Sequence, residues 1–452
     1  MKTIVIGTNH AGTTAVRTLR RLAPEMEVTT YDQSDVISFL GCGIALWVGG
    51  QIKDPQGLFY ASPELLKKEK INVNMNHKWV GIDKVKKTVK FENLLTKEIV
   101  EDHYDKLIIS TGTWPVTPPI EGIDLENVQI CKNYYHAQKI KAANNDKNIK
   151  NITIVGAGYI GVELVDAFVK SGKNVSLVDI CDRIMPMYYD GEMTEIIEKE
   201  MQQNNVNLFL KSKVVKFGGV NGKVNKVILD NGEIDTDYVV FSVGVKPKTE
   251  LLKGIIDLDE RGAVITNDYM QSSDKNIYAI GDCATVLNIA LNKRIQVALA
   301  TTAVRTGILA AINIVKNNAL KSPGFTGANG IEVFNWKMGA TGISMTAAKK
   351  MGIDAEEKVF EDNDRPEFMP TFKKVKIKLI WEKKSRRIIG AQVASTNNHT
   401  EVMYMFALAI QKGLTIDELP LVDIFFLPHF NKPYNFITLA SLEVLGLNFF
   451  KE

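Results

Sequence analysis

Two stretches of this chain share one hydrophobic pattern: a short apolar run, a glycine-rich turn, a helix-like stretch, and a second apolar run ending in aspartate. In the first, Ile4–Ile6 leads into Gly7, a helical pattern covers Thr13–Leu22, and Val28–Tyr31 ends at Asp32. Apolar runs of this length, bounded by turn residues, are typical of buried parallel strands. The pattern predicts a strand, a tight turn, a helix and a parallel second strand.

The second stretch repeats the pattern with a full set of glycines. Ile152–Val155 precedes Gly156, Gly158 and Gly161, and the next apolar run ends at Asp179. This is the dinucleotide-binding fingerprint, in which glycines form the turn, a helix N-terminus binds pyrophosphate and the acid binds ribose hydroxyls. We therefore expect two Rossmann-like units, each with a nucleotide site.

Asp179, the aspartate of the second unit, favours NAD over NADP, because its carboxylate would repel the 2′-phosphate of NADP. Arg183 lies only four residues beyond Asp179 and carries a charge that could accommodate that phosphate. The sequence therefore favours NAD and leaves NADP open.

The rest of the chain adds strand ends and a third unit. Further apolar strands end at Ser110–Gly112, before Gly244 and at Asp282, and a long helix is expected from Gln296 to Val315. Past residue 322 the pattern changes to alternating strands and a helix without a phosphate-binding turn, which predicts a separate α+β domain of ordinary size.

Composition narrows the class of protein. The chain has 452 residues, of which 45% are hydrophobic and 24% charged, as in an ordinary globular protein of several domains. A net charge of +3 without a basic stripe gives no case for nucleic acid. Four widely spaced cysteines favour a reducing cytoplasm over a secreted disulfide framework. We expect neither a membrane span nor a metal site.

Cys42 is the main candidate for chemistry. It stands between Gly41 and Gly43, ahead of an apolar run that begins at Ile44. A sulfur at a helix N-terminus faces free N–H groups and the positive end of the helix dipole, so we expect a lowered pKa. The next cysteine is Cys131, so a sulfenic acid is expected rather than a local disulfide. Cys131, Cys181 and Cys283 are interpreted as packed thiols.

These motifs, in this order, resemble those of the two-dinucleotide-binding-domain flavoprotein reductases. Within them, the segments 7–12, 38–43 and 425–433 are similar to the subgroup of water-forming NADH oxidases, NADH peroxidases and coenzyme A-disulfide reductases. The resemblance covers the whole chain. It implies an α/β fold with an FAD-binding domain (residues 1–118 and 248–322), an NAD-binding domain inserted within it (119–247), and a C-terminal α+β dimerisation domain (323–452).

The resemblance also implies catalytic roles for three residues. Cys42 corresponds to a redox cysteine that alternates between thiolate and sulfenic acid beside the flavin. His10 corresponds to the histidine that hydrogen-bonds the oxygen on that sulfur. His429 corresponds to a residue that approaches the flavin of the partner subunit in a dimer.

Cofactor contacts are implied at the turns, strand ends and helix starts described above. Tyr159 corresponds to an aromatic gate over the flavin face where nicotinamide stacks, with Glu163 one helical turn away. The residues assigned to the two cofactors are Gly7, Asn9, His10, Ala11, Gly12, Asp32, Cys42, Val80, Ser110, Thr111, Gly112, Lys132, Gly156, Gly158, Tyr159, Ile160, Gly161, Glu163, Asp179, Tyr188, Gly244, Asp282, Ala298, Leu299 and Ala300.

The function implied is that of a cytoplasmic FAD-dependent NADH oxidase that reduces O2 to water, as a homodimer or a dimer of dimers. Two alternatives use the same residues. An NADH peroxidase would take added peroxide, and a coenzyme A-disulfide reductase would form a mixed disulfide on Cys42. A third alternative is a flavin-binding redox sensor with little turnover.

Overall fold

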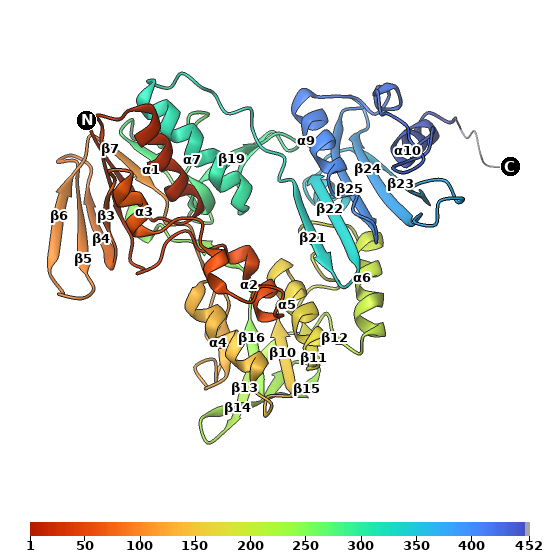
Figure 1. The fold of residues 1–452 in the computed structure, drawn as a ribbon, viewed down its shortest axis with the longest axis horizontal. Helices are drawn as coiled ribbons and strands as arrows, with labels where there is room; N and C mark the ends of the chain where they lie inside the picture. Colours follow the sequence, from red (N-terminus) through yellow and green to blue (C-terminus); the bar gives the residue numbers. More distant parts are fainter. Residues whose placement is uncertain (448–452) are drawn as a thin grey trace.

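The computed structural model describes residues 1–447, arranged as three lobes (Figure 1). The first lobe contains a parallel five-stranded sheet of order β18-β7-β1-β2-β3, which is covered by two helices that lie side by side. Its elements are β1 (Lys2–Ile6), α1 (His10–Leu22), β2 (Glu27–Tyr31), α3 (Pro63–Lys68), β3 (Asn72–Asn74), β7 (Lys106–Ile109), β18 (Ile277–Ala279) and α7 (Ala300–Val315). Two smaller antiparallel sheets belong to it, β4 (His77–Asp83) with β5 (Thr88–Asn93) and β6 (Ile99–His103), and β19 (Thr285–Asn288) with β20 (Lys293–Gln296).

The second lobe repeats this architecture. Its parallel sheet has the order β12-β11-β10-β16-β9. The elements are β9 (Val128–Ile130), α4 (Tyr134–Asn145), β10 (Asn151–Val155), α5 (Tyr159–Lys170), β11 (Asn174–Val178), α6 (Gly191–Gln203), β12 (Asn207–Phe209) and β16 (Tyr238–Phe241), with an antiparallel sheet of β13 (Val214–Val220), β14 (Lys223–Leu229) and β15 (Gly232–Asp235).

The second lobe is inserted into the first in sequence. β18 and α7 complete the first lobe, although they follow the second lobe in the chain. Where the chain leaves and re-enters the first lobe, β8 (Thr113–Pro115) pairs antiparallel with β17 (Val245–Pro247). This topology agrees with an inserted domain, while the division at residues 118, 247 and 322 stays a prediction.

The third lobe is an antiparallel sheet of order β21-β22-β25-β24-β23, and its described residues, up to 447, form three α-helices. Its elements are β21 (Asn329–Val333), β22 (Trp336–Gly342), α8 (Met345–Lys350), β23 (Ala355–Asn363), β24 (Lys374–Glu382), β25 (Ile388–Ser395), α9 (Val402–Lys412) and α10 (Phe436–Val444). Apolar residues of β21 and β22 share a core with the second lobe. The predicted third domain was drawn to residue 452, and residues 448–452 lie outside the described part of the chain.

The segment 39–58 belongs to the first lobe in sequence but packs against the second. It contains the short helix α2 (Ile44–Val48), which lies on α4 and α5 (Figure 1). Ile44 and Val48 are buried in the core of the second lobe, and Trp47 stacks on Tyr134 with ring centroids 5.6 Å apart. Burial of these apolar side chains therefore ties the two lobes together.

Helix starts are where the sequence-based expectations were least accurate. The helix expected from Gln296 begins at Ala300, because residues 293–296 pair with β19 instead. The helix expected from Thr13 begins at His10, directly after the first glycine turn. Within the described residues, no helix is both long and apolar enough to cross a bilayer.

Close packing of α1 on α7 gives a stability prediction. A Cβ built on Gly307 would lie 2.5 Å from the carbonyl oxygen of Ala11, so Gly307→Ala must force the helices apart. We expect a loss of about 1–3 kcal/mol in the free energy of unfolding, despite the better helix propensity of alanine. Gly232→Ala is the control, since a Cβ there meets no heavy atom within 4 Å. Urea unfolding followed by circular dichroism compares the two; equal stabilities would contradict the prediction.

Candidate functional site

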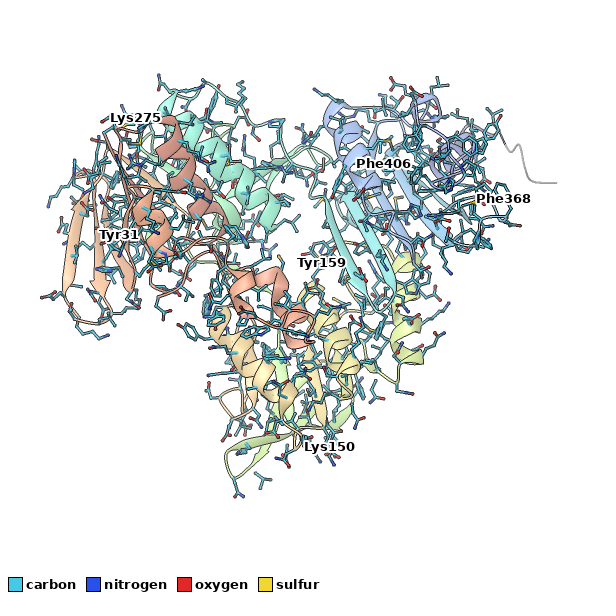
Figure 2. All side chains as sticks on the ribbon, in the orientation of Figure 1. Tyr31, Lys150, Tyr159, Lys275, Phe368 and Phe406 are labelled. Atoms are coloured by element: carbon cyan, nitrogen blue, oxygen red, sulfur yellow. The ribbon has the colours of Figure 1, made fainter. Side chains whose placement is uncertain are left out.

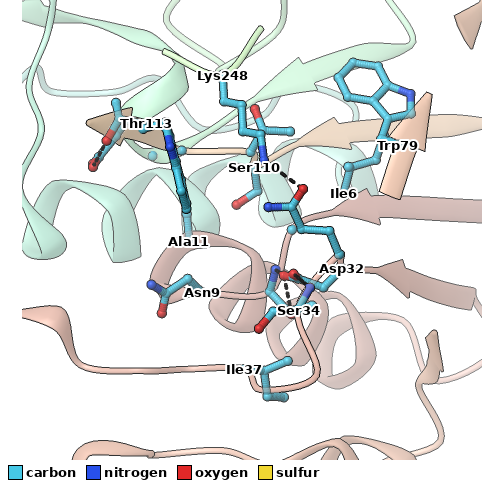
Figure 3. Close-up of a pocket in the computed structure, with 18 of the residues that line it drawn as sticks. Ile6, Asn9, Ala11, Asp32, Ser34, Ile37, Trp79, Ser110, Thr113 and Lys248 are labelled. Atoms are coloured by element: carbon cyan, nitrogen blue, oxygen red, sulfur yellow. Dashed lines mark hydrogen bonds between the residues drawn. The ribbon is translucent and has the colours of Figure 1, made fainter. Parts of the chain in front are cut away.

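A cavity of about 520 Å³ opens along the carboxyl ends of the first lobe's strands (Figure 3). Asp32 and Ser34 border one part of it, and Lys248 and Trp79 reach it from other strands and loops (Figure 3). Lys248 donates a hydrogen bond to the Gln33 side chain at 2.8 Å. The carboxyl ends of parallel strands are the usual ligand-binding edge of such sheets.

The first glycine turn is built by contacts that only glycine permits. Gly7 has φ +96°, and a Cβ on it would lie 2.3 Å from the carbonyl oxygen of Ser110. A Cβ on Gly12 would lie 1.8 Å from the carbonyl oxygen of Gly7, so α1 starts directly against the strand. The Asp32 carboxylate closes the turn by accepting hydrogen bonds from Thr8 N–H at 2.7 Å and the Thr8 hydroxyl at 2.8 Å.

The second turn has nearly the same geometry. Gly156 has φ +108°, and its Cβ would lie 2.5 Å from the carbonyl oxygen of Ser242. A Cβ on Gly161 would lie 1.9 Å from the carbonyl oxygen of Gly156. The Asp179 carboxylate accepts a hydrogen bond from Ala157 N–H at 2.6 Å. Both units therefore bring a helix N-terminus close to a strand end, as a pyrophosphate site requires.

The structure brings most of the predicted cofactor residues together in two groups. Ala298 and Leu299 lie just before α7 and Ala300 is its first residue, while Gly12 lies in the first turn of α1. Predicted residues that line the first cavity are Gly7, Asn9, His10, Ala11, Asp32, Val80, Ser110, Thr111, Gly112, Lys132 and Asp282. Those at the second turn and its helix are Gly156, Gly158, Tyr159, Ile160, Gly161 and Glu163, with Asp179, Tyr188 and Gly244 on the loops that follow β11 and β16.

Sequence reasoning missed several residues of the first cavity. The Lys248 ammonium lies 5.4 Å from the ring centroid of Trp114, and Trp79 comes from the antiparallel sheet. The missed lining residues include Thr8, Gln33, Ser34, Lys78, Trp79, Trp114, Tyr134, Lys248 and Ala303. Thr8 lies between the predicted residues Gly7 and Asn9, and Ser34 follows Asp32 by two positions, so turn-motif reasoning could have found both. The others carry no local pattern.

Cys42 lies at the junction of the two lobes. It is in the short 3₁₀ turn Gly41–Gly43 directly before α2, as the sequence predicted. All four cysteines are free, and Cys42 is the exposed one. It is not among the residues that line the first cavity, but the charges of Glu163, Asp282 and Lys132 all act on its sulfur.

The predicted lowering of the Cys42 pKa is wrong for this chain by itself. Dehydration by the surrounding protein is the largest effect, the Glu163 carboxylate is the next, and both raise the pKa of the thiol. α2 has only five residues, so its dipole is weak. The chain alone therefore does not favour the thiolate.

His10 is held by Tyr60 rather than by Cys42. Its Nδ1 lies 3.0 Å from the Tyr60 hydroxyl, and the two rings are parallel within 7° at a centroid distance of 5.7 Å. Burial lowers the pKa of His10, with Asp282 opposing and Lys132 adding to the effect. Among the described contacts His10 makes no hydrogen bond to Cys42, although Asp282 and Lys132 act on both side chains.

Aromatic residues gather at the second turn. The rings of Tyr159 and Tyr188 meet edge to face with centroids 4.5 Å apart, and the hydroxyls of Tyr159 and Tyr189 lie 3.0 Å apart. Glu163 is half-buried one helical turn further, and burial raises its pKa to about 7. The second site thus has an aromatic wall and, beside it, a carboxyl group whose pKa is raised by burial.

His429 is in a different place. It is exposed on the third lobe in a loop rich in exposed aromatic residues, among them Phe425, Phe426 and Phe430. It does not line the first cavity. Within the described residues there is also no cluster of side chains that could hold a metal ion.

The fold and the two turns define a nucleotide-dependent oxidoreductase with two dinucleotide sites and a free cysteine at their junction. Residues 1–307 match the family model for pyridine nucleotide-disulphide oxidoreductases, and residues 330–434 match the dimerisation domain of the same family. The chain belongs to this family, which confirms the predicted enzyme class and the α/β fold class.

Individual relatives are similar over nearly their whole length. The chain is 44% identical to an NADH oxidase of Enterococcus faecalis, over 98% of this chain and 99% of the relative. It superposes on the water-forming NADH oxidase from Lactobacillus brevis bound to NADH with a TM-score of 0.96 and 40% identity, covering 99% and 98% of the two chains. It is 30% identical to an NAD(P)H coenzyme A polysulfide/persulfide reductase of Pyrococcus horikoshii, over 95% of each chain.

The charge near Cys42 gives a testable pH effect. Glu163→Gln removes a carboxylate that raises the pKa of Cys42, so the pH midpoint for alkylation of Cys42 by iodoacetamide should move lower. The difference should be largest above pH 7, where Glu163 is ionised. A Cys181→Ser background removes the other accessible thiol, because Cys131 and Cys283 are buried. An unchanged or higher midpoint would show that Glu163 does not act on this sulfur.

Proposed function

We propose that this protein is a water-forming NADH oxidase that uses FAD and a single redox cysteine. The observation that carries the proposal is the position of Cys42, exposed and unpaired, where the first lobe packs on the second. The similarity to NADH oxidases over 98% of the chain supports it. The overall reaction is O2 with two NADH and two protons, giving two water molecules and two NAD⁺.

The first cavity fits FAD. Its volume of about 520 Å³ suits a large cofactor, and the Gly7 turn allows backbone to approach a pyrophosphate. Asp32 would accept hydrogen bonds from the adenosine ribose and Asp282 from the ribityl chain. When bound there, FAD supplies the transfer of hydride from NADH and of electrons to oxygen.

The second turn fits NADH. The Gly156 turn repeats the pyrophosphate geometry, and Asp179 would bind the adenosine ribose. Arg183, considered as a partner for a 2′-phosphate, donates a hydrogen bond to the Thr346 hydroxyl at 3.1 Å instead. That engagement favours NADH over NADPH. Tyr159 and Tyr188 would flank the nicotinamide.

Cys42 and His10 would complete the reduction of peroxide to water. The Cys42 thiolate attacks one oxygen of hydrogen peroxide, the O–O bond breaks, and Cys42 becomes a sulfenic acid while hydroxide leaves. The Nε2–H of His10 donates a hydrogen bond to that hydroxide, which takes a proton from solvent to give the first water. Two electrons and two protons from the second NADH and solvent return the sulfenic acid to the thiol with release of the second water.

Tyr60 would set the protonation of His10. Burial raises the pKa of Tyr60 to about 12, so its hydroxyl stays protonated and can donate to Nδ1 of His10. The proton of neutral His10 is then on Nε2, which is the nitrogen available to the reacting oxygen.

A dimer would complete the site. The matching dimerisation domain and the exposed aromatic residues around His429 support a homodimer. His429 would then act on the flavin of the partner. The same proposal includes O2 as the oxidant and a cytoplasmic location. It also includes a dimer of dimers as the alternative to a homodimer.

One alternative has support of its own. The Pyrococcus horikoshii relative is an NAD(P)H coenzyme A polysulfide/persulfide reductase, and an exposed cysteine that forms no disulfide suits a mixed disulfide. Oxygen uptake with NADH separates the two, because a disulfide or persulfide reductase consumes little oxygen without its sulfur substrate. A peroxidase or a redox sensor would likewise show slow uptake.

Removal of the sulfur is the direct test of the proposal. Cys42→Ser should still consume NADH and oxygen but release close to one hydrogen peroxide per oxygen, because the step from peroxide to water needs the thiolate. An oxygen electrode with and without catalase measures the yield. Cys181→Ser, at the other accessible thiol, should still form water. Water formation by the Cys42→Ser variant would remove the role given to this residue.

Tyr60→Phe tests the hydrogen bond to His10 while keeping the stacked ring. Loss of this bond should lower the rate of sulfenic acid formation with added peroxide about tenfold and increase peroxide release. Tyr135→Phe is the matched control, because that hydroxyl bonds Asp35 at the surface. Stopped-flow absorbance with peroxide gives the rate. Equal rates for both variants would show that Tyr60 does not orient His10.

A further inference from the structure

The loop 179–190, which begins at the second nucleotide site, ends on the third lobe. Asp190 is its last residue and is buried. Its carboxylate accepts hydrogen bonds from Met345 N–H at 2.8 Å, Thr346 N–H at 2.9 Å, the Thr346 hydroxyl at 2.7 Å and the Gln392 side chain at 2.9 Å. The Asp190 N–H donates to the same Gln392 side chain at 3.0 Å.

Lys378 adds a buried charge to this contact. Its side chain is 2% exposed, and its ammonium lies 3.1 Å from the Asp190 carboxylate and also contacts Glu192 and Glu357. Burial alone would raise the pKa of Asp190, but the Thr346 hydrogen bonds and Lys378 lower it to about 2. Asp190, Thr346, Lys378 and Gln392 are called the Asp190 clamp below.

The clamp adjoins the aromatic wall of the second site. Tyr188 and Tyr189 directly precede Asp190, and both contact Tyr159. Tyr159 also donates a hydrogen bond to Asn329, the first residue of β21. Figure 2 shows Tyr159 where the second lobe meets the strands of the third. The third lobe therefore holds the pair Tyr159 and Tyr188 from two directions.

We propose that the Asp190 clamp is a positioning device for NADH: the third lobe, through Thr346, Gln392 and Lys378, sets the place of Tyr188 at the nicotinamide site. This inference rests on the proposed function. The physical basis is that the apparent affinity for NADH depends on the fraction of molecules whose site is already in the binding-competent conformation. If the loop end is released, only a fraction of molecules has Tyr188 in place, and the apparent affinity for NADH falls by that fraction.

Thr346 allows a mild test, because it is exposed at the start of α8. Thr346→Val keeps the side-chain volume but removes the hydroxyl that donates to Asp190 and accepts from Arg183. We expect the KM for NADH to rise about five- to tenfold, as expected for losing one hydrogen bond to a charge. Oxidation of the reduced enzyme by O2, measured separately by stopped flow, should stay within about twofold. Thr346→Ser keeps the hydroxyl and should restore the wild-type KM.

A second readout does not depend on activity. In Thr346→Val without nucleotide, amide hydrogen exchange should speed up in residues 180–190 and stay unchanged in residues 7–22. Gln392→Met removes a different donor to the same carboxylate and should act alike. Lys376→Met is the matched control on β24, because Lys376 pairs with Glu361 instead.

Failure of the clamp proposal can be distinguished from failure of the proposed function. Unchanged exchange or an unchanged KM in Thr346→Val would overturn the clamp proposal, as would failure of Thr346→Ser to restore both. If the wild-type protein carried no FAD or did not oxidise NADH, the proposed function would fail, and the exchange experiment would still report whether the clamp holds the loop.

Discussion

The packing of α2 on the second lobe is the contact on which the arrangement of the site depends. Ile44, Trp47 and Val48 are taken out of water against α4 and α5, and this burial fixes the turn that carries Cys42. Because the segment leaves the first lobe and returns to it, one sulfur is held at the boundary of two nucleotide sites. The reaction proposed above, in which electrons pass between two bound nucleotides and then to a sulfur, would need this closeness.

Both Rossmann-like lobes use glycine to let a helix begin close against a strand. At each turn one glycine accepts a left-handed backbone and a second lets the helix start within van der Waals distance of the strand. The aspartate that follows each second strand accepts a hydrogen bond from an N–H group of the turn, so it shapes the turn. The two turns differ in the side chains beside them: Lys248 and Trp79 line the cavity at the first, and Tyr159 and Tyr188 pack together at the second.

Local patterns were sufficient for the strands beside the two glycine turns, for the turns and the two aspartates, and for the third domain, because each has a signal within a few residues. The N-terminus of α7 was misplaced because the run that precedes it pairs with β19, which periodicity does not reveal. The cavity lining from Lys248 and Trp79 was missed, because both reach it from elements distant in sequence. The pKa of Cys42 was misjudged because dehydration by the folded protein, the largest effect, and the Glu163 charge from another lobe both depend on the tertiary fold. The Asp190 clamp joins Asp190 to residues between 156 and 202 positions away and has no sequence signature.

The position of β18 and α7 has a consequence for biogenesis. The first lobe lacks its edge strand and one of its two covering helices until the ribosome has synthesised the whole of the second lobe. During that interval the emerging N-terminal segment carries an unpaired strand edge and an uncovered apolar face, both prone to aggregation. The inserted lobe, which is continuous in sequence, can collapse first, and the N-terminal part of the nascent chain would then need chaperone protection until translation of α7 is complete.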